Sequence, residues 1–410
     1  MYPRNNKKAG FGLLFLVLAE SAVLQYNGSS RKTEVNLINV LILSCHTGGG
    51  HDAAAEALAE AFRRAGHKAV RYDFFGLHSQ KAETAASDIY GGTVNHSPKL
   101  FQALYRVGSA ISSPRRHSPV YYANAYFAPA LEAMLKTEPF DLAVSTHIFP
   151  AHALTWLKAR GRTEIPFAGV MTDYTCIPFW EETRCDLYIT PHPYLTEEIV
   201  RRGIPAEKIF PLGIPVSPAL SDEQPGREAL GLKEDVPLVT MLSGSMGHGN
   251  LGAIVDALLR EGGQALQIAV IAGRNEKLKQ ALESRYGSEP QVFIKGFENM
   301  PPWLQNSDVL ITKPGGLTIT EAAAVRVPLV LANAIPGCET ANQEFFVSRG
   351  MAAAPDTPDE QARAALGLCG DRKARERMRA AQAQAVRPDN ARQICGLLLE
   401  KFGGGGYVQN

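Results

Sequence analysis

The chain lacks paired cysteines and an excess of charge of either sign. It has six cysteines in 410 residues, and no two of them have Cys-x-x-Cys spacing. Neither a zinc ribbon nor a disulfide framework is therefore predicted, and a reducing compartment is the default. Lys and Arg number 42 against 41 Asp and Glu, which argues against a general nucleic-acid binder. At 45% hydrophobic and 20% charged residues, the composition excludes a disordered or fibrous chain.

No apolar run is long enough to cross a bilayer, which takes about 20 residues. The best candidate, residues 11–19, ends at Glu20. Lys7 and Lys8 precede this run, so it resembles the basic and apolar regions of a signal peptide. We prefer to interpret residues 1–35 as an N-terminal tail, because the rest of the chain is typical of an intracellular enzyme without disulfides.

Acidic residues are missing from residues 89–131. Asp and Glu make up 41 of 410 residues, so a stretch of this length should hold about four. Basic and aromatic side chains are interleaved there instead, which suits a surface facing anionic lipid. A neutral loop followed by a core helix is the alternative. The membrane or acceptor candidates in this stretch are Arg106, Arg115, Arg116, Tyr121 and Tyr122.

Strands alternate with helices along the first half of the chain. A short apolar run at residues 39–44 predicts a buried strand, and a glycine turn and a helical segment at 52–64 follow it. This order opens a βαβ unit. The pattern recurs with strands at 141–145 and 167–171 and a helix at 151–160. Such alternation predicts a parallel sheet covered on both faces.

A segment rich in proline and glycine, 211–218, interrupts this pattern, which then restarts. The second series has strands at 238–242, 269–272, 292–295, 309–312 and 329–331, a helix at 251–260, and terminal helices at 371–386 and 390–401. The predicted fold class is therefore α/β, with two Rossmann-like doubly wound domains facing a cleft. The predicted domains span 36–217 and 218–402, with the terminal helices in the second and a flexible tail at 403–410.

Three glycine-rich turns each open a predicted helix, at residues 48–50, 244–247 and 315–316. A helix start offers free N–H groups and the positive end of a dipole, so three such turns favour an anionic ligand. Glu321 lies about one helical turn past the third and can accept hydrogen bonds from ribose hydroxyls. His51 ends the first turn, where the dipole disfavours the imidazolium, which suits a general base. For each turn alone, ordinary turn geometry is the alternative.

Some familiar nucleotide and metal motifs are absent. None of the turns reads Gly-x-Gly-x-x-Gly or forms a P-loop, so a dinucleotide site or an NTPase is not supported. Asp-x-Asp, which would often hold a divalent metal against a nucleotide-sugar, does not occur. We therefore expect no metal and no cofactor, and we expect helix starts and backbone amides to stabilise a diphosphate leaving group.

Taken in order, the motifs resemble the processive diacylglycerol glucosyltransferases and monogalactosyldiacylglycerol synthases. The resemblance covers about residues 36–402 and rests on six segments: 46–51, Thr172-Asp173-Tyr174 with Trp180, 213–216, 244–247, 313–321, and 336–342. It implies a GT-B type glycosyltransferase fold, a UDP-hexose donor, a diacylglycerol acceptor, inversion at the anomeric carbon, and peripheral attachment to the cytoplasmic face of the membrane. No nucleic-acid partner is implied.

The resemblance also assigns roles to residues. His51 is the implied catalytic base, and Asp173 either orients it or serves as a second base. The implied donor-binding residues are Gly49, Gly50, Gly244, Ser245, Met246, Phe297, Gly315, Gly316, Thr318, Glu321, Cys338, Glu339 and Asn342. Within this set, Phe297 marks the uracil site, Glu321 holds the ribose, and Glu339 and Asn342 face the sugar.

Two positions depart from the family pattern. Cys338 stands where the family often has a glutamine that touches the donor sugar, and Ile177 stands where a histidine is frequent. The sequence predicts a hexosyltransferase, with glucose as the expected sugar, that uses UDP-sugar and diacylglycerol. The alternatives are an N-acetylglucosaminyltransferase acting on a polyprenyl-linked acceptor, a UDP-sugar-binding regulatory protein without turnover, and a UDP-sugar epimerase.

Overall fold

The first half of the chain is built on a six-stranded parallel sheet in the order β2-β1-β3-β4-β5-β6. The structure is a computed structural model that describes residues 37–46, 49–81, 83–84, 106–108, 110–242 and 251–403. The strands are β1 (Asn39–Ser44), β2 (Lys68–Asp73), β3 (Leu142–Ser145), β4 (Phe167–Val170), β5 (Leu187–Ile189) and β6 (Ile209–Phe210). The strand order reverses between β1 and β3, which is where ligands of open α/β sheets bind.

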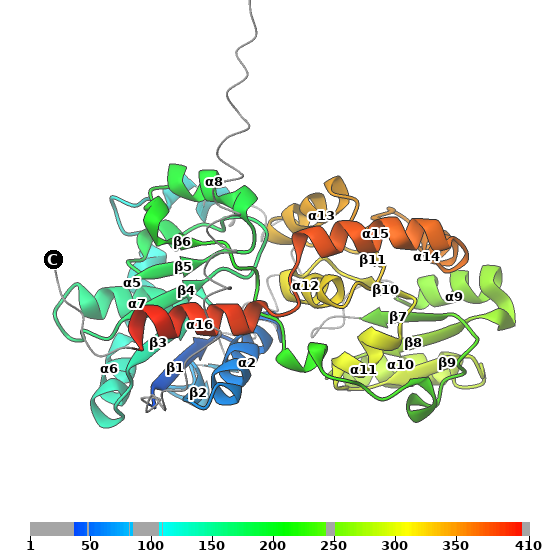
Figure 1. The fold of residues 1–410 in the computed structure, drawn as a ribbon, viewed down its shortest axis with the longest axis horizontal. Helices are drawn as coiled ribbons and strands as arrows, with labels where there is room; N and C mark the ends of the chain where they lie inside the picture. Colours follow the sequence, from blue (N-terminus) through cyan, green and yellow to red (C-terminus); the bar gives the residue numbers. More distant parts are fainter. Residues whose placement is uncertain are drawn as a thin grey trace, which may run out of the picture. The chain divides into compact units, whose positions relative to one another are not determined.

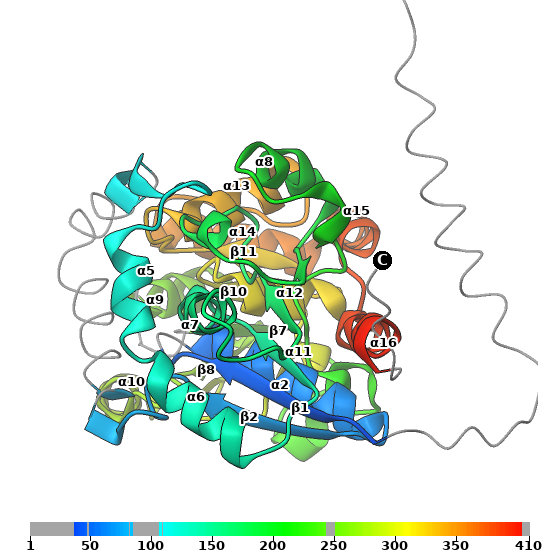
Figure 2. The ribbon, with the colours of Figure 1, turned by 90° about the vertical axis from the view of Figure 1, so that its left-hand side faces the viewer.

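Helices cover both faces of this sheet, and the side chains of β1 alternate between them. Leu41 and Leu43 belong to the core cluster beneath α6 (Ala128–Thr137) and α7 (Ile148–Lys158). Val40 and Ile42 belong to the cluster beneath α2 (Gly49–Arg64) and α16 (Asn390–Phe402). Figure 2 shows α5 (Pro119–Ala125) and α6 on one side of the sheet and α16 on the other. The sheet is thus the middle of three layers, as the sequence predicts.

The second half is built on a five-stranded parallel sheet in the order β11-β10-β7-β8-β9. The strands are β7 (Leu238–Leu242), β8 (Gln267–Ile271), β9 (Val292–Lys295), β10 (Val309–Thr312) and β11 (Leu329–Leu331). This is the Rossmann order, and it reverses between β7 and β10. The two sheets confirm the predicted α/β fold class.

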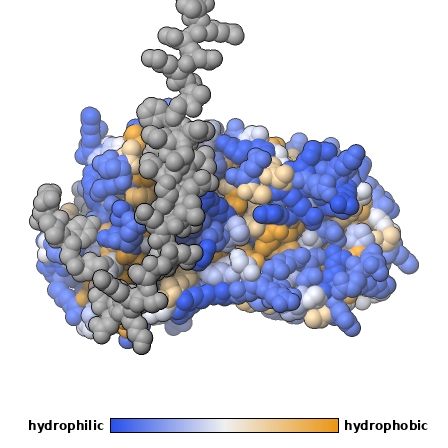
Figure 3. Space-filling view, in the orientation of Figure 1, coloured by the Kyte–Doolittle hydropathy of each residue, from blue (hydrophilic) through white to orange (hydrophobic). Residues whose placement is uncertain are grey.

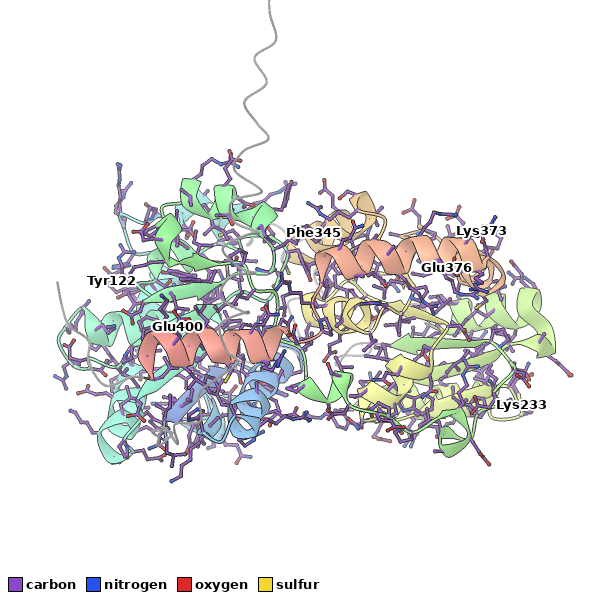
Figure 4. All side chains as sticks on the ribbon, in the orientation of Figure 1. Tyr122, Lys233, Phe345, Lys373, Glu376 and Glu400 are labelled. Carbon is purple, nitrogen blue, oxygen red and sulfur yellow. The ribbon has the colours of Figure 1, made fainter. Side chains whose placement is uncertain are left out.

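Helices pack on this sheet as well. They are α9 (Leu251–Gly262), α10 (Glu276–Tyr286), α11 (Met300–Asn306), α12 (Gly316–Ala324), α13 (Cys338–Ser348), α14 (Pro358–Gly370) and α15 (Arg372–Ala385). Figure 3 shows mostly hydrophilic residues over α15, in keeping with the exposed Lys373 and Glu376 labelled in Figure 4. The short helix α8 (Thr196–Arg201) belongs to the first half.

The last helix returns to the first half. Figure 1 shows α16 beside the first sheet, and its Ile394 and Leu398 share the buried cluster of β1 and α2. Asn390, at its start, accepts a hydrogen bond from the backbone N–H of Val216 at 3.0 Å and donates to the carbonyl of Ile214. The chain therefore crosses between the halves twice, and Asn390 ties the two crossings together. The predicted domain boundaries stay predictions, but α16 packs on the first sheet and not, as the sequence suggested, with the second half.

Candidate active site

The candidate site begins where β1, β3 and β4 end, beside the point of strand reversal. α2 starts at Gly49, five residues after β1 ends, so its first turn lies at the carboxyl edge of the sheet. His51 is in this first turn. Thr146 follows β3 directly, and Thr172 lies two residues after β4. Because parallel strands share one carboxyl edge, these three side chains meet there.

His51 is held by its Nδ1 atom. Nδ1 lies 3.0 Å from the carbonyl oxygen of Thr146 and 3.0 Å from the hydroxyl oxygen of Thr172. A carbonyl oxygen only accepts hydrogen bonds, so Nδ1 carries the proton and donates it. The Thr146 hydroxyl in turn donates to the backbone carbonyl of His51 at 3.1 Å. The neutral imidazole therefore has its lone pair on Nε2, as a general base requires.

A second histidine lies against the first. The rings of His51 and His147 are edge to face, with centroids 4.5 Å apart. His147 caps the start of α7, where its Nδ1 accepts from the N–H of Phe149 at 3.2 Å. Burial lowers the pKa of His147 well below its usual range, and the neighbouring His51 lowers it further. His147 is therefore neutral at pH 7 and puts no positive charge beside His51.

Two helix starts come together at this edge. A Cβ atom added to Gly316, the first residue of α12, would lie 2.0 Å from the carbonyl oxygen of Thr172, so only glycine fits there. A Cβ atom on Gly50 would lie 3.8 Å from the Cβ of Leu317. The starts of α2 and α12 are thus neighbours, and both present backbone N–H groups and positive dipole ends that suit a phosphate group.

Asn342 of α13 joins the second half to the loop after β4. Its side-chain oxygen accepts from the N–H of Tyr174 at 2.6 Å, and its amide nitrogen donates to Asp173 at 2.8 Å and to the carbonyl of Pro314 at 3.0 Å. Tyr174 also stacks on Phe345, with ring centroids 4.5 Å apart; Phe345 is labelled in Figure 4. The Asp173 carboxylate is thus bonded to Asn342, while Thr146 and Thr172 orient His51.

Cys338 and Glu339 begin α13, after a turn that requires glycine because Gly337 has φ 117°. Glu339 is buried, forms an ion pair with Lys313, and accepts from the N–H of Ile335 at 3.0 Å. Burial raises the pKa of the Cys338 thiol well above its usual range, and the carboxylates of Asp173 and Glu339 raise it further. Cys338 therefore presents a neutral thiol at the edge of the predicted donor site.

Glu321 differs from the other carboxylates of the site. It lies on α12 and is only partly exposed, and its carboxylate has no hydrogen-bond or ion-pair partner in the described part of the chain. Loss of hydration raises its pKa to about 7. A desolvated carboxylate that the protein leaves unpaired is typical of a ligand site. Thr318, one helical turn before it, is also partly exposed.

Other predicted site residues are more peripheral. The Phe297 side chain is 70% exposed, and the Arg274 guanidinium lies 4.9 Å from its ring centroid. A Cβ atom added to Gly315 would have no neighbouring heavy atom closer than 3.9 Å, so this glycine is not tightly packed. Gly244, Ser245 and Met246 lie outside the described residues, as do all of residues 89–105.

The residues predicted to contact the membrane or the acceptor differ in their exposure to solvent. Arg106, Arg115, Arg116 and Tyr122 are exposed, and Tyr122 lies at the outer side of α5 (Figure 4). Tyr121 is instead buried, with its ring stacked on His117 at 3.7 Å between centroids. Tyr121 therefore supports the packing of α5, and a surface role in this segment falls to its neighbours.

Sequence reasoning gave no role to Thr146, Thr172 or His147, although all three surround His51. Their shared signal in the sequence is position, since each follows a predicted strand within three residues; Thr172 also belongs to the Thr172-Asp173-Tyr174 motif. Within the described ranges, no three His, Cys, Asp or Glu side chains gather as metal ligands would.

Comparison with known families separates the two halves of the chain. Residues 51–216 match the family of monogalactosyldiacylglycerol (MGDG) synthases, and residues 253–385 match glycosyl transferases group 1. The chain is 29% identical to the processive diacylglycerol beta-glucosyltransferase of Bacillus cytotoxicus over 369 residues, which cover 88% of this chain and 93% of that protein. The enzyme of the same name from Bacillus thuringiensis is 28% identical over 369 residues, with the same coverage.

Solved structures share the fold. MurG of Acinetobacter baumannii superposes with a TM-score of 0.56 at 16% identity, covering 88% of this chain and 99% of that one. MnaA of S. aureus, solved with UDP, gives a TM-score of 0.58 at 13% identity, covering 90% and 97%. At such identities the likeness shows the fold alone. The predicted resemblance to the diacylglycerol glycosyltransferase family and the GT-B type fold are both confirmed.

Proposed function

We propose that this chain, an MGDG synthase domain joined to a group 1 glycosyltransferase domain, transfers a hexose from a UDP-sugar to 1,2-diacylglycerol. We take glucose as the hexose, because the two Bacillus relatives are named beta-glucosyltransferases. The observation that carries the proposal is His51, whose Nδ1 is bonded to the Thr146 carbonyl and whose Nε2 is left as a base beside two helix starts. The product is a glycolipid.

The reaction follows from this arrangement. The acceptor hydroxyl gives its proton to Nε2 of His51 while its oxygen forms a bond to the anomeric carbon of the sugar. The bond from that carbon to the diphosphate oxygen breaks on the opposite face, so the configuration inverts. The leaving UDP gains negative charge, and the N–H groups at the starts of α2 and α12 stabilise it. Proton transfer to a positioned base contributes about 10²–10⁴ in rate.

The donor side is assigned to the second half. Glu321 would accept hydrogen bonds from the ribose hydroxyls, which supply the partners that its carboxylate lacks within the described part of the chain. The backbone near Phe297 would hold the uracil, and Gly315, Gly316 and Thr318 would lie along the phosphates and sugar. Gly49, Gly50, Gly244, Ser245 and Met246 keep their predicted donor roles. Glu339 and Asn342 would frame the sugar while bonded to the protein as described.

We further propose that the first half binds the cytoplasmic face of the membrane. No helix in the described ranges has the length and apolar character of a membrane span. Apolar side chains are nevertheless exposed beside the basic ones: Val107, Ile111, Tyr122 and Tyr126 are 42–72% exposed. Arginines close to such residues favour contact with anionic lipid, at about 1 kcal/mol for each basic residue near the surface.

The test is transfer with purified protein and lipid vesicles. Vesicles containing diacylglycerol and anionic phospholipid are incubated with UDP-glucose, UDP-galactose or UDP-N-acetylglucosamine, and the lipids are resolved by mass. We expect a hexose to be added to diacylglycerol, and addition about 10²–10⁴-fold slower with the His51→Ala variant. Addition of N-acetylglucosamine to a polyprenyl-linked acceptor, or conversion of the UDP-sugar without any lipid, would instead support one of the alternative activities.

A further inference from the structure

Thr172 stands at an unusual position, between the base and the other half of the chain. Its hydroxyl oxygen lies 3.0 Å from Nδ1 of His51, and the side chain is 7% exposed. Because Nδ1 already donates to the Thr146 carbonyl, the Thr172 oxygen is a second acceptor of the same N–H. When Nε2 takes a proton, the ring becomes a cation, and both Nδ1 bonds strengthen. Thr172 therefore favours the protonated base that forms during reaction.

The second half of the chain fixes where Thr172 lies. Asn342 holds the next two residues, through the Asp173 carboxylate and the backbone N–H of Tyr174. Gly316 lies directly against the Thr172 carbonyl, as the 2.0 Å approach of an added Cβ atom shows. The Thr172 hydroxyl is thus placed by α12 and α13, although the residue itself follows a strand of the first sheet.

We propose that Thr172 is a positioning residue for His51 and that Asn342 acts through it, so that contact with α13 completes the base. This inference rests on the proposed function. It gives Asn342 a task that differs from the donor contact predicted from the sequence: the amide orients the loop that orients the base. The base then has both Nδ1 acceptors only while the Asn342 bonds are intact.

The charged and titratable groups near His51 lie on α2, α7 and the loop after β4. His147 on α7 faces its ring. Asp52, the next residue on α2, is bonded to Ser44 and Arg71 and pairs with His46. Asp173, in the loop after β4, is bonded to Asn342. None of these bonds involves the Thr172 hydroxyl, so a variant that removes this hydroxyl tests its contact with Nδ1.

Thr172→Val removes the hydroxyl at nearly constant volume, and Thr172→Ser restores it. We expect Thr172→Val to lower kcat about 3- to 10-fold, the extra strength of a charge-assisted over a neutral hydrogen bond, with KM for both substrates within about twofold. The acid limb of the kcat/KM profile should move about 0.5 to 1 unit to lower pH, because the cation loses an acceptor. Thr172→Ser should recover most of both effects.

The matched control is Thr190→Val. Thr190 is fully buried in the first half, and its hydroxyl has no hydrogen-bond partner in the described part of the chain. We expect this variant to keep the kcat and the pH profile of the natural protein. If Thr172→Val also keeps both, or if Thr190→Val changes them equally, the positioning role is wrong.

A double-mutant cycle tests the role of Asn342. If Asn342 acts through Thr172, Asn342→Ala lowers kcat, and adding Thr172→Val lowers it little further. If Asn342 acts only on the sugar and not through Thr172, KM for the UDP-sugar rises and the two effects multiply. The second result would overturn the Asn342 part of the proposal.

An NMR measurement keeps this proposal separate from the proposed function. Histidine labelled with ¹⁵N reports which ring nitrogen of His51 carries the proton, and His51→Gln assigns the signal. We expect the Nδ1–H form in the natural protein, and in Thr172→Val a population of the Nε2–H form or a lower pKa of His51. An unchanged His51 signal would refute the positioning role even if transfer to diacylglycerol were confirmed, and a changed signal would support it even if transfer failed.

Discussion

The unpaired carboxylate of Glu321 makes a prediction about stability as well as binding. Its pKa is raised from 4.5 to about 7 by loss of hydration alone. A carboxyl group whose pKa is raised on folding binds its proton more tightly in the folded state than in the unfolded state. The folded state is therefore favoured while the group is protonated and loses this advantage as the group ionises. The free energy of unfolding should therefore fall as pH rises from about 4.5 to about 7 and stay level above that. Glu321→Gln, which is neutral at every pH, should abolish this part of the pH dependence.

The magnitude follows from the shift. Each pKa unit corresponds to about 1.4 kcal/mol, so the full shift corresponds to roughly 3 kcal/mol at pH 8. Glu321 is partly exposed, so solvent screening reduces this figure, and we expect about 1–3 kcal/mol. Urea unfolding of both forms at pH 4.5 and pH 8, without nucleotide, measures it. Glu321→Gln should match the natural protein at pH 4.5 and exceed it at pH 8.

Ligand binding should show the opposite preference. Ribose hydroxyls donate to the carboxylate rather than to the acid, so UDP affinity should rise up to about tenfold between pH 6 and pH 8. Glu321→Gln should lose affinity and most of this rise, and any rise that remains reports the titration of the phosphate. A stability gain equal at both pH values, or UDP affinity unaffected by the substitution, would refute the view that Glu321 is a desolvated carboxylate kept for the nucleotide.

Four further predictions concern the same site and surface. His51→Ala should lower turnover about 10²–10⁴-fold and leave UDP affinity nearly unchanged; equal loss of both would argue against a base. Chelator should leave most activity intact with vesicles held constant, since no Asp-x-Asp is present; complete loss restored by manganese or magnesium would contradict this. Exchanging Arg115 and Arg116 for Glu should release the protein from anionic vesicles in sedimentation at low salt, whereas unchanged binding would favour a plain surface loop. Cys338→Gln should sharpen the kcat/KM preference among UDP-glucose, UDP-galactose and UDP-N-acetylglucosamine, because an amide bonds a sugar hydroxyl better than a thiol does; an unchanged ratio would place donor choice elsewhere.

Local patterns predicted the central strands well. The runs at 39–44, 238–242 and 309–312 became β1, β7 and β10 with the same bounds, because buried parallel strands are continuous apolar runs. The glycine turns at Gly50 and Gly316 also open helices as predicted. These features depend on short-range composition, which the sequence displays directly.

Three strands of the first sheet were not predicted from the sequence. β2 forms one edge of this sheet, and β5 and β6 are the last two strands at the other edge. β2 is an edge strand in which half of the residues are exposed and three are charged, so it has no apolar run. β5 and β6 have three and two residues, too few for a periodic signal. Their neighbours in the sheet, rather than their own composition, make them strands.

The residues that orient His51 could not be predicted from the sequence either. Thr146 and Thr172 are 95 and 121 residues away in the chain, and only the common edge of the sheet brings them to Nδ1. Tyr121 shows the reverse case. Its place among basic and aromatic residues predicted a position on the surface, but the side chain is buried and stacks on His117. Side-chain roles of this kind depend on tertiary packing.

The return of α16 to the first sheet limits how the two halves can be exchanged between relatives. A chimera joined only near residue 217 would pair the α16 of one parent with the β1 and α2 of the other. Ile394 and Leu398 would then have to fill a foreign buried cluster, and Asn390 would have to meet the other parent's version of Ile214 and Val216. A second junction between α15 and α16 avoids both mismatches. In recombination, the part of the chain that builds the first half is thus discontinuous in sequence. The second half, to which we assign donor binding, would have to be exchanged as an insert rather than as a C-terminal piece.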